Sequence, residues 1–288
     1  TLLAYGQTGS GKTYTMGTSG SPSEPEGALQ RALRAIFTRA QERETEGASA
    51  TSFRVSYVEI FTDASRGNTE EIRDLLSPGR VPLAFAAIKT DIDGQVKLEG
   101  VLEHEVWTAQ EALTLLSYGS TSRATCSTRM NDSSSRSHAL FALEVIQRRL
   151  VAGVPSTLTA KFQFVDLAGS EKVKLSGVEG EQLSQAININ HGLFVLGRVI
   201  TALTEGHHHV PFRESKLTRI LQNSLGGNSR TCMIACVSPS DANIADSIST
   251  LTYAAKAKEI TNKPVVNRGS SCSNCAQLQV RLEQLEAA

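Results

Sequence analysis

The sequence predicts an α/β fold in which helices lie on both sides of a central, mostly parallel or mixed β-sheet. Runs rich in β-branched and aromatic residues have the length of strands. Amphipathic segments with helical periodicity lie between these runs, and such alternation is typical of a sheet covered by helices. Hydrophobic residues make up 40% of the 288 residues and charged residues 20%, which is an ordinary composition for a chain that buries a core.

The strands are predicted from five short runs in which apolar β-formers dominate. These runs cover residues 2–5, 53–61, 138–147, 158–165 and 231–237. Residues 28–43 instead carry apolar side chains at intervals of three and four, so they are predicted to form an amphipathic helix. Three polar stretches read as loops, and they are residues 18–26, 62–69 and 205–209.

Three further helices are predicted from their starting signals. Thr108 and Glu111 form a capping box that opens a helix through Leu116. A long helix follows Gly180, because its leucines and isoleucines recur at roughly helical intervals. Ser240 is expected to cap the last helix, which precedes a polar tail.

Composition excludes several classes of partner. Lys and Arg total 29 and Asp and Glu total 29, so bulk charge gives no attraction to nucleic acid or to an anionic membrane. No apolar run approaches the roughly 18 residues of a membrane-spanning helix. Five scattered cysteines, an odd number, favour a reducing cytosol. Because residues 1–5 read as the tail of a buried strand, we expect an N-terminal part to be missing.

The strongest motif is a glycine-rich loop of the form G-x-x-x-x-G-K-[ST]. It consists of Gly6, Gln7, Thr8, Gly9, Ser10, Gly11, Lys12 and Thr13. The loop follows a predicted strand, so its backbone N–H groups and the next helix N-terminus would surround phosphate oxygens. Lys12 would contact the β- and γ-phosphates, and Thr13 would ligate Mg²⁺. The motif predicts a P-loop NTPase.

Two other stretches fit the same chemistry. The strand over residues 161–166 ends in Asp166, where a nucleotide site needs a carboxylate to orient Mg²⁺ and its waters. Gly169 follows and could turn its amide toward a γ-phosphate. Residues 131–138 form a hydroxyl-rich loop that runs into a strand; alone, this loop would read as a solvated turn.

Together these three stretches resemble the kinesin superfamily. The P-loop continues through Tyr14, residues 131–138 have the switch I form N-x-x-S-S-R-S-H, and residues 166–171 have the switch II form D-L-A-G-S-E. The resemblance extends over nearly the whole chain, through residues 186–190, 211–219, 224–228 and 251–255. It implies the kinesin motor fold, lacking its first strands. Residues 262–267 are weakly similar to the chromokinesin-like branch.

The resemblance implies ATP and Mg²⁺ as ligands and ATP hydrolysis as the activity. It assigns the nucleotide to the loop from Gly6 through Tyr14. It assigns the metal to Thr13, Ser135 and Asp166, and catalysis to Ser134, Ser135, Arg136, Gly169 and Glu171. Arg136 and Glu171 are expected to form a salt bridge that closes the two switches around the attacking water.

The resemblance also implies microtubules as the partner and the microtubule cytoskeleton of the cytoplasm as the location. The expected tubulin contacts are Lys172, Lys174, Arg213, Lys216 and Arg219. The helix after switch II has Gln182 and Ser184 where relatives commonly carry charges. An alternative therefore stays open, a microtubule-binding ATPase or adaptor with little or no motility.

Three regions are expected along the chain. Residues 1–259 would form the motor domain without its N-terminal part, and residues 260–267 a neck linker. Residues 268–288 would be a polar linker and the start of a coiled coil, because Leu278, Leu282 and Leu285 recur at spacings of four and three. A homodimer through a downstream coiled coil stays open, and no direct contact with nucleic acid or membrane is expected.

Overall fold

The computed structural model describes residues 1–19, 24–45, 50–63, 69–78, 88–90, 96–129, 136–151, 154–171 and 191–269. The strands of the main sheet are β1 (Leu2–Tyr5), β2 (Ala50–Asp63), β3 (Thr69–Asp74), β6 (His104–Val106), β7 (His138–Val151), β8 (Val154–Asp166), β9 (Cys232–Ala235) and β10 (Arg268–Gly269). Their order is β3-β2-β7-β8-β1-β9, with β6 paired to β2 and β10 to β8. β4 (Ile88–Thr90) and β5 (Val96–Leu98) form a separate hairpin.

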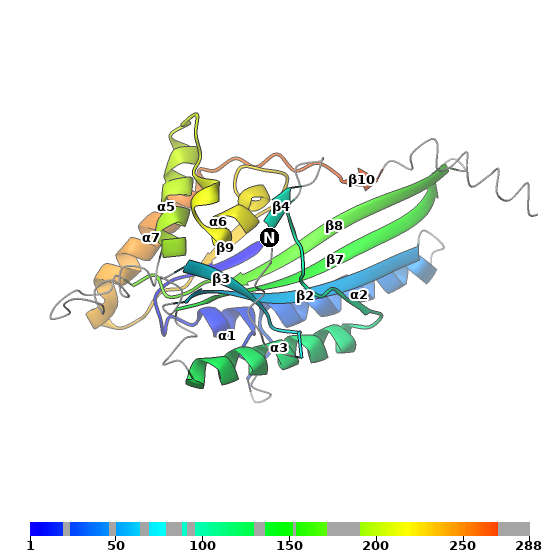
Figure 1. The fold of residues 1–288 in the computed structure, drawn as a ribbon, viewed down its shortest axis with the longest axis horizontal. Helices are drawn as coiled ribbons and strands as arrows, with labels where there is room; N and C mark the ends of the chain where they lie inside the picture. The colour runs from blue at the N-terminus through cyan, green and yellow to red at the C-terminus, as the bar shows by residue number, and fades with distance from the viewer. Residues whose placement is uncertain are drawn as a thin grey trace, which may run out of the picture.

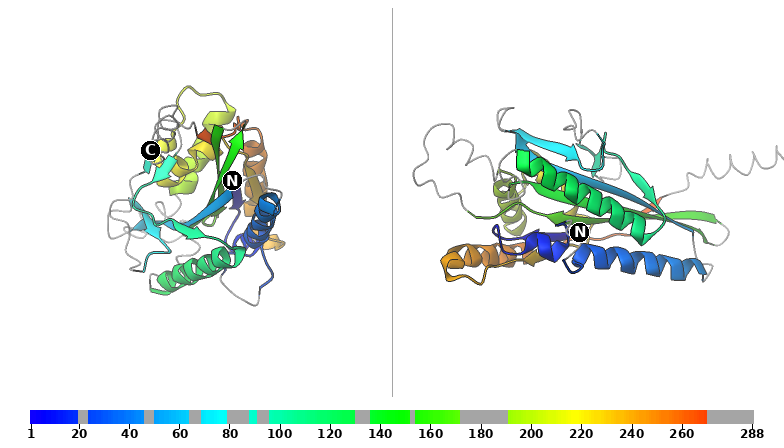
Figure 2. Two further views of the ribbon diagram at one scale, coloured as in Figure 1. Left: turned by 90° about the vertical axis from the view of Figure 1, so that its right-hand side faces the viewer. Right: turned by 90° about the horizontal axis from the view of Figure 1, so that it is seen from below.

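Helices cover both faces of this sheet, as Figures 1 and 2 show. The helices on one face are α1 (Lys12–Met16), α2 (Ala28–Thr45) and α3 (Ala109–Arg129). Those on the other face are α5 (His191–Thr204), α6 (Lys216–Ile220) and α7 (Ile244–Lys258). No helix in the described part of the chain is long and apolar enough to cross a bilayer.

The sheet is mixed, which confirms the predicted fold class. β1 runs parallel to both of its neighbours, β8 and β9. β2, β7 and β8 form a long antiparallel ribbon, with Val58 opposite Leu140 and Leu140 opposite Val165. The carboxyl end of β1 is thereby held between two parallel strands, which is where α/β folds bind ligands.

The alternation of side chains along each strand produces two cores. Ala4 and Phe141 face the core beneath α1, α2 and α3, whereas their neighbours Leu3 and Leu140 face the core beneath α5 and α6. Because successive strand residues point to opposite faces, strands covered on both sides must be apolar at nearly every position. This explains why the central strands could be predicted from short apolar runs.

Two predicted helix starts have different outcomes. The capping box is confirmed, because the Glu111 amide donates to Thr108 Oγ1 at 3.1 Å and Glu111 Oε2 accepts from the Trp107 amide at 2.8 Å. The prediction for Ser240 is wrong. Its side chain makes no capping bond, and a 3₁₀ turn over Asp241–Asn243 leads into α7 instead.

Candidate nucleotide-binding site

The phosphate loop connects β1 to α1. Gly11 is the N-cap of α1 and has φ 89°, a left-handed conformation that favours glycine. Gly6 is required for a different reason, since a Cβ added there would lie 2.0 Å from the carbonyl oxygen of Cys236 on the neighbouring segment. The glycines therefore allow the loop to turn tightly and to approach the next strand closely.

The Lys12 side chain points into this loop and is only 7% exposed. Its Nζ donates to the carbonyl oxygen of Gln7 at 2.8 Å. Burial lowers the pKa of Lys12, and the negative charges of Asp166 and Glu171 oppose that effect. The loop therefore encloses an ammonium group at the position where the motif expects phosphate oxygens.

Asp166 ends β8 beside the loop and is almost fully buried. Its Oδ2 accepts hydrogen bonds from Thr13 Oγ1 at 2.9 Å and from Thr18 Oγ1 at 3.2 Å. Its Oδ1 is buried without a hydrogen-bond partner. An unpartnered carboxylate oxygen beside a threonine hydroxyl fits Mg²⁺, which prefers oxygen ligands and retains several waters. Within the described residues no cluster of three or more His, Cys, Asp or Glu side chains offers another metal site.

Arg123 on α3 belongs to this site, although the sequence analysis did not identify it. Its NH1 lies 2.9 Å from Asp166 Oδ2 and its Nε lies 3.8 Å from Glu59 Oε1. Glu59 Oε2 in turn pairs with Arg73 NH1 at 2.9 Å. Burial opposes the charge of Arg123, but Asp166, Tyr57 and Glu59 raise its pKa above the usual value. A buried chain of alternating charges thus runs from β3 to the candidate metal ligand.

Switch II is packed directly on the phosphate loop. Glu171 accepts hydrogen bonds from the amide of Thr8 at 2.8 Å and from Thr8 Oγ1 at 2.5 Å. Burial would raise the pKa of Glu171, but these bonds and the charge of Lys12 lower it overall. A Cβ added at Gly169 would lie 2.3 Å from Glu171 Oε2 and 2.4 Å from Thr8 Oγ1, so a larger residue there would displace the contact between Glu171 and Thr8.

His138 joins the start of β7 to switch II. Its Nδ1 accepts a hydrogen bond from the Ala168 amide at 3.0 Å, and the ring is buried. Burial and the charge of Arg123 lower the pKa of His138 to about 3, although Asp166 opposes the shift. The ring is therefore neutral at physiological pH and holds switch II as an acceptor.

The remaining predicted catalytic residues are only partly placed. Ser134 and Ser135 lie outside the described residues. Arg136 is exposed, and the Glu171 carboxylate bonds to Thr8, so the salt bridge between Arg136 and Glu171 stays a prediction. Tyr14 follows the loop on α1 and is 56% exposed.

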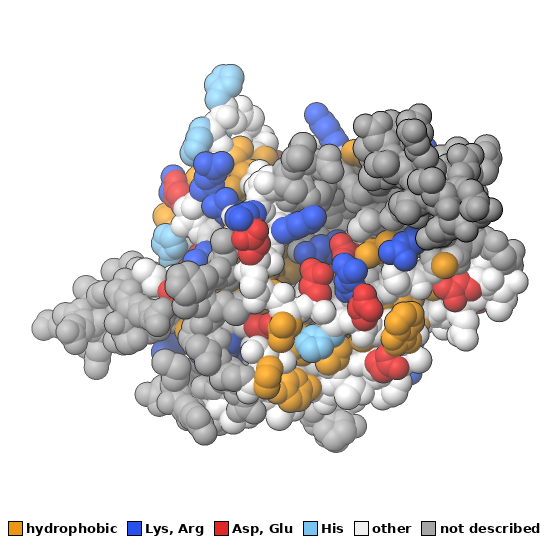
Figure 3. Space-filling model, turned by 45° about the vertical axis from the view of Figure 1, so that its right-hand side comes forward, with side chains coloured by type: hydrophobic (Ala, Val, Ile, Leu, Met, Phe, Trp, Pro, Cys, Tyr) orange, Lys and Arg blue, Asp and Glu red, His pale blue; other side chains and the backbone are white. Residues whose placement is uncertain are grey.

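Three of the predicted tubulin-contact residues lie on or beside α6. Arg213 is exposed, and Lys216 and Arg219 are half-buried. Lys216 Nζ pairs with Glu71 Oε2 at 3.3 Å. Figure 3 shows Lys and Arg side chains interleaved with Asp and Glu on one face of the molecule. Lys172 and Lys174 lie outside the described residues.

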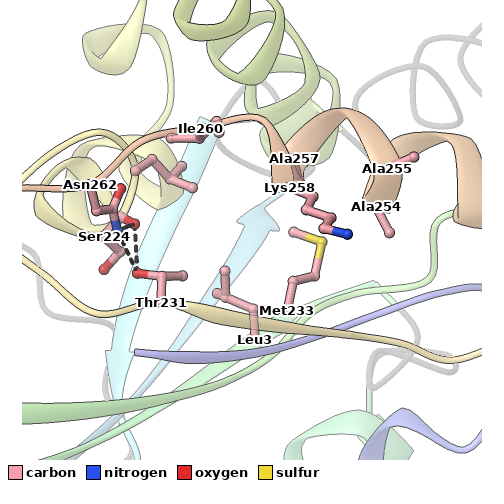
Figure 4. Close-up of a pocket in the computed structure, with 11 residues that line it drawn as sticks. Leu3, Ser224, Thr231, Met233, Ala254, Ala255, Ala257, Lys258, Ile260 and Asn262 are labelled. Carbon is pink, nitrogen blue, oxygen red and sulfur yellow. Dashed lines mark hydrogen bonds between the residues drawn. The ribbon is translucent and has the colours of Figure 1, made fainter.

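The segment from Ile260 to Asn267 lies against the body of the protein. Asn262 Nδ2 donates to Ser224 O at 3.0 Å and to Ser229 O at 2.9 Å, and Asn262 Oδ1 accepts from the Gly226 amide. Figure 4 shows Asn262 beside a cavity of about 460 Å³ between the end of α7 and the sheet, with Leu3 on the sheet side. This segment is therefore docked along its length.

Docking continues toward the long ribbon. The Lys263 amide donates to Gly227 O at 3.0 Å, and the Val265 amide donates to Asn228 Oδ1 at 2.6 Å. The Thr159 amide of β8 donates to Asn267 O at 3.1 Å. The Asn262 side chain and these backbone groups together account for the position of a segment with little buried side-chain area.

Comparisons with known proteins identify the family. The kinesin motor domain family model matches residues 1–260. Kinesin-like protein KIN-4C of Arabidopsis thaliana is 42% identical over 99% of this chain, which spans 24% of that protein. Chromosome-associated kinesin KIF4A of Homo sapiens is 43% identical over 99% of this chain, which spans 23% of that protein.

A solved structure of a fast kinesin, described for its ATPase mechanism and interactions with microtubules, is also similar. It has a TM-score of 0.81 and 41% identity, and the match covers 94% of this chain and 73% of that chain. The match confirms the resemblance found in the P-loop and switch sequences. The chain belongs to the kinesin motor domain family.

Proposed function

We propose that this chain binds ATP with Mg²⁺ and hydrolyses it in a cycle coupled to microtubule binding and movement. One observation carries the proposal: Asp166, Gly169 and Glu171 of switch II converge on the loop that encloses Lys12. Two loops that are 153 residues apart in the chain thus meet around Lys12 and Thr13. Phosphoryl transfer depends on such positioning and charge stabilisation more than on a strong base.

Each residue at the site has a definite task. Lys12 binds the β- and γ-phosphates, and the Gly169 amide contacts the γ-phosphate. Thr13, Ser135 and Asp166 hold Mg²⁺, which neutralises phosphate charge when bound. Ser134 supports the γ-phosphate from switch I. Arg136 and Glu171 close around the attacking water, for which Glu171 must leave Thr8.

Microtubules would bind on the face of the sheet that α5, α6 and α7 cover. Arg213, Lys216 and Arg219, together with Lys172 and Lys174, bind the acidic tubulin surface, because local basic groups suffice even when net charge is zero. Membership of the motor domain family supports the motor over the adaptor. The location is the microtubule cytoskeleton of the cytoplasm.

The proposed division of the chain follows from this function. Residues 1–259 form the motor domain, and residues 260–267 are the neck linker that docks and releases. Residues 268–288 comprise a polar linker and the start of a coiled coil that would pair two copies; Arg268 and Gly269 form β10, and residues 270–288 lie outside those the structure describes.

Two substitutions test the nucleotide site. Lys12→Ala is expected to abolish ATP binding, because the phosphates lose their buried cation. Glu171→Ala is expected to bind ATP but to hydrolyse it at least about a hundredfold more slowly on microtubules, a typical loss for a positioning group. Nucleotide affinity and microtubule-stimulated phosphate release measure the two effects separately.

The same assays decide between motor and adaptor. Wild-type protein should show stimulated turnover and should move microtubules in a gliding assay. Binding without movement would favour the adaptor, and equal hydrolysis by Glu171→Ala and wild type would refute the role given to Glu171.

A further inference from the structure

Glu70 on β3 holds the beginning of α6. Its Oε1 accepts a hydrogen bond from Ser215 Oγ at 2.8 Å, and its Oε2 accepts one from the backbone amide of Lys216. Ser215 Oγ also accepts from the Leu217 amide at 3.1 Å, which makes it the N-cap of α6. One carboxylate therefore fixes both the cap and the first residue of a five-residue helix that has little stability of its own.

The same carboxylate touches α5. A Cβ added at Gly192 would lie 2.8 Å from Glu70 Oε1 and 3.2 Å from His138 Nε2. His138 is the ring that accepts the Ala168 amide of switch II. Glu70 therefore lies where α5, α6 and the residues that hold switch II come together.

β3 is also connected to the nucleotide site through its other end. Arg73 of this strand pairs with Glu59, and Glu59 lies beside Arg123, the partner of Asp166. In β3 one side chain thus belongs to the buried charge chain and another to the start of α6. The strand is too short to bend much between them, since four residues span about 10 Å.

We propose that Glu70 is a positioning residue for the microtubule interaction, which it supports by fixing α6 and with it Lys216 and Arg219. The inference rests on the proposed function, because it names what orients the proposed track residues. Glu70 itself need not touch tubulin. Glu70 holds α6 in one orientation. Lys216 and Arg219 of that helix can then bind the microtubule without the free-energy cost of ordering the helix on binding.

A positioning role and a simple charge effect predict opposite changes in microtubule affinity when Glu70 is replaced. Removing a carboxylate near basic track residues makes that surface more positive, which by itself strengthens binding to an acidic partner. Loss of a positioning group weakens binding instead. The sign of the change on Glu70→Gln is therefore informative.

The test measures microtubule-stimulated ATPase in Glu70→Gln, with Glu71→Gln as the matched control. Glu71 is the adjacent carboxylate; it pairs with Lys216 Nζ at 3.3 Å and accepts a hydrogen bond from Thr69 Oγ1 at 3.3 Å. In Glu70→Gln the microtubule concentration for half-maximal rate should rise about fivefold, as expected when hydrogen bonds to a charged carboxylate are replaced by bonds to a neutral amide. Basal ATPase should stay unchanged, and Glu71→Gln should leave that concentration equal or lower.

Gly192→Ala is a second variant that should displace the Glu70 carboxylate from the start of α6. Its new methyl group would lie 2.8 Å from Glu70 Oε1 and 3.2 Å from His138 Nε2, so the carboxylate has to move furthest. Alanine favours the helix, so a loss of helix propensity cannot explain weaker binding. It should reproduce the Glu70→Gln effect, and the double variant should be no worse than either single one. This variant keeps the inference testable where Glu70→Gln fails to fold.

Three results would overturn the inference. They are a half-maximal concentration that does not rise in Glu70→Gln, an equal rise in Glu71→Gln, and additive effects of Glu70→Gln and Gly192→Ala. When wild-type protein itself shows no stimulation by microtubules, the proposed function fails and this inference fails with it. Wild-type stimulation with an unaffected Glu70→Gln variant refutes the inference alone.

Discussion

His138 is expected to make the free energy of unfolding depend on pH. Its pKa is about 3 in the folded protein and about 6.5 when unfolded. Because the unfolded chain binds more protons in that range, this contribution to stability is complete above about pH 6.5 and is lost as pH falls toward 3. Between pH 7 and pH 5 the free energy of unfolding should fall by about 2 kcal/mol through this residue.

The measurement compares urea unfolding of wild type and His138→Asn at the two pH values. Asparagine can still accept the Ala168 amide but does not titrate. The variant should therefore lose less stability between pH 7 and pH 5 than wild type does. An equal loss in both proteins would assign the pH dependence to other groups.

Residue identity was predictable at the site only where a motif specified it. Lys12, Thr13 and Asp166 could be identified because glycine spacing and a strand end fix their places. Arg123 could not, because it lies inside a helix whose sequence shows no phosphate signal, and its partner Glu59 is distant in the chain. Only the packing of α3 against β2 and β8 brings these charges together.

Among the elements, the docked segment from Ile260 to Asn267 depends most on one side chain. Asn262 accepts one hydrogen bond and donates to several acceptors around residues 224–231. Asn262→Ala should release the segment, because few apolar contacts remain to hold it. Amide exchange at Lys263 and Val265 should then accelerate about tenfold or more, as expected for loss of more than one hydrogen bond.

Asn243→Ala is the matched control for this prediction. Asn243 donates to Ser238 Oγ at 3.1 Å before α7 begins, at a distance in sequence from the docked segment. Its replacement should leave exchange at Lys263 unchanged. Equal exchange in wild type and Asn262→Ala would show that the backbone bonds alone hold the segment.

Element types were easier to predict than their ends. The central strands alternate between two apolar cores, so their existence follows from composition, yet β8 begins at Val154, four residues before the predicted start at Leu158. Ser240 had the residue type of a cap but not its geometry, because a 3₁₀ turn takes its place. The capping box was predictable because it requires two residues at a fixed spacing, not one.

At the scale of the molecule, zero net charge does not prevent a few basic side chains around α6 from meeting an acidic partner. The tubulin contacts proposed for Arg213, Lys216 and Arg219 should weaken with salt, because the screening length falls from about 30 Å at 0.01 M to about 8 Å at 0.15 M. We expect the half-maximal microtubule concentration to rise severalfold over that range. The salt dependence of stimulated ATPase checks this expectation.

Two arginine variants locate the effect on one face. Arg213→Gln should reduce the salt dependence, whereas Arg39→Gln should leave it unchanged, because Arg39 lies on α2 on the opposite side of the sheet. The same change in both variants would indicate that overall charge, not the surface around α6, governs binding.

The close approach of the Cys236 carbonyl oxygen to Gly6 predicts how related sequences would change if they lost the activity. A Cβ added at that position would lie 2.0 Å from the carbonyl oxygen of Cys236, which belongs to the protein's own neighbouring segment. A duplicate gene that had lost its enzymatic activity would still keep this glycine for folding. Substitutions would be expected first at Lys12, because a buried ammonium group destabilises the folded protein when no phosphate binds to it.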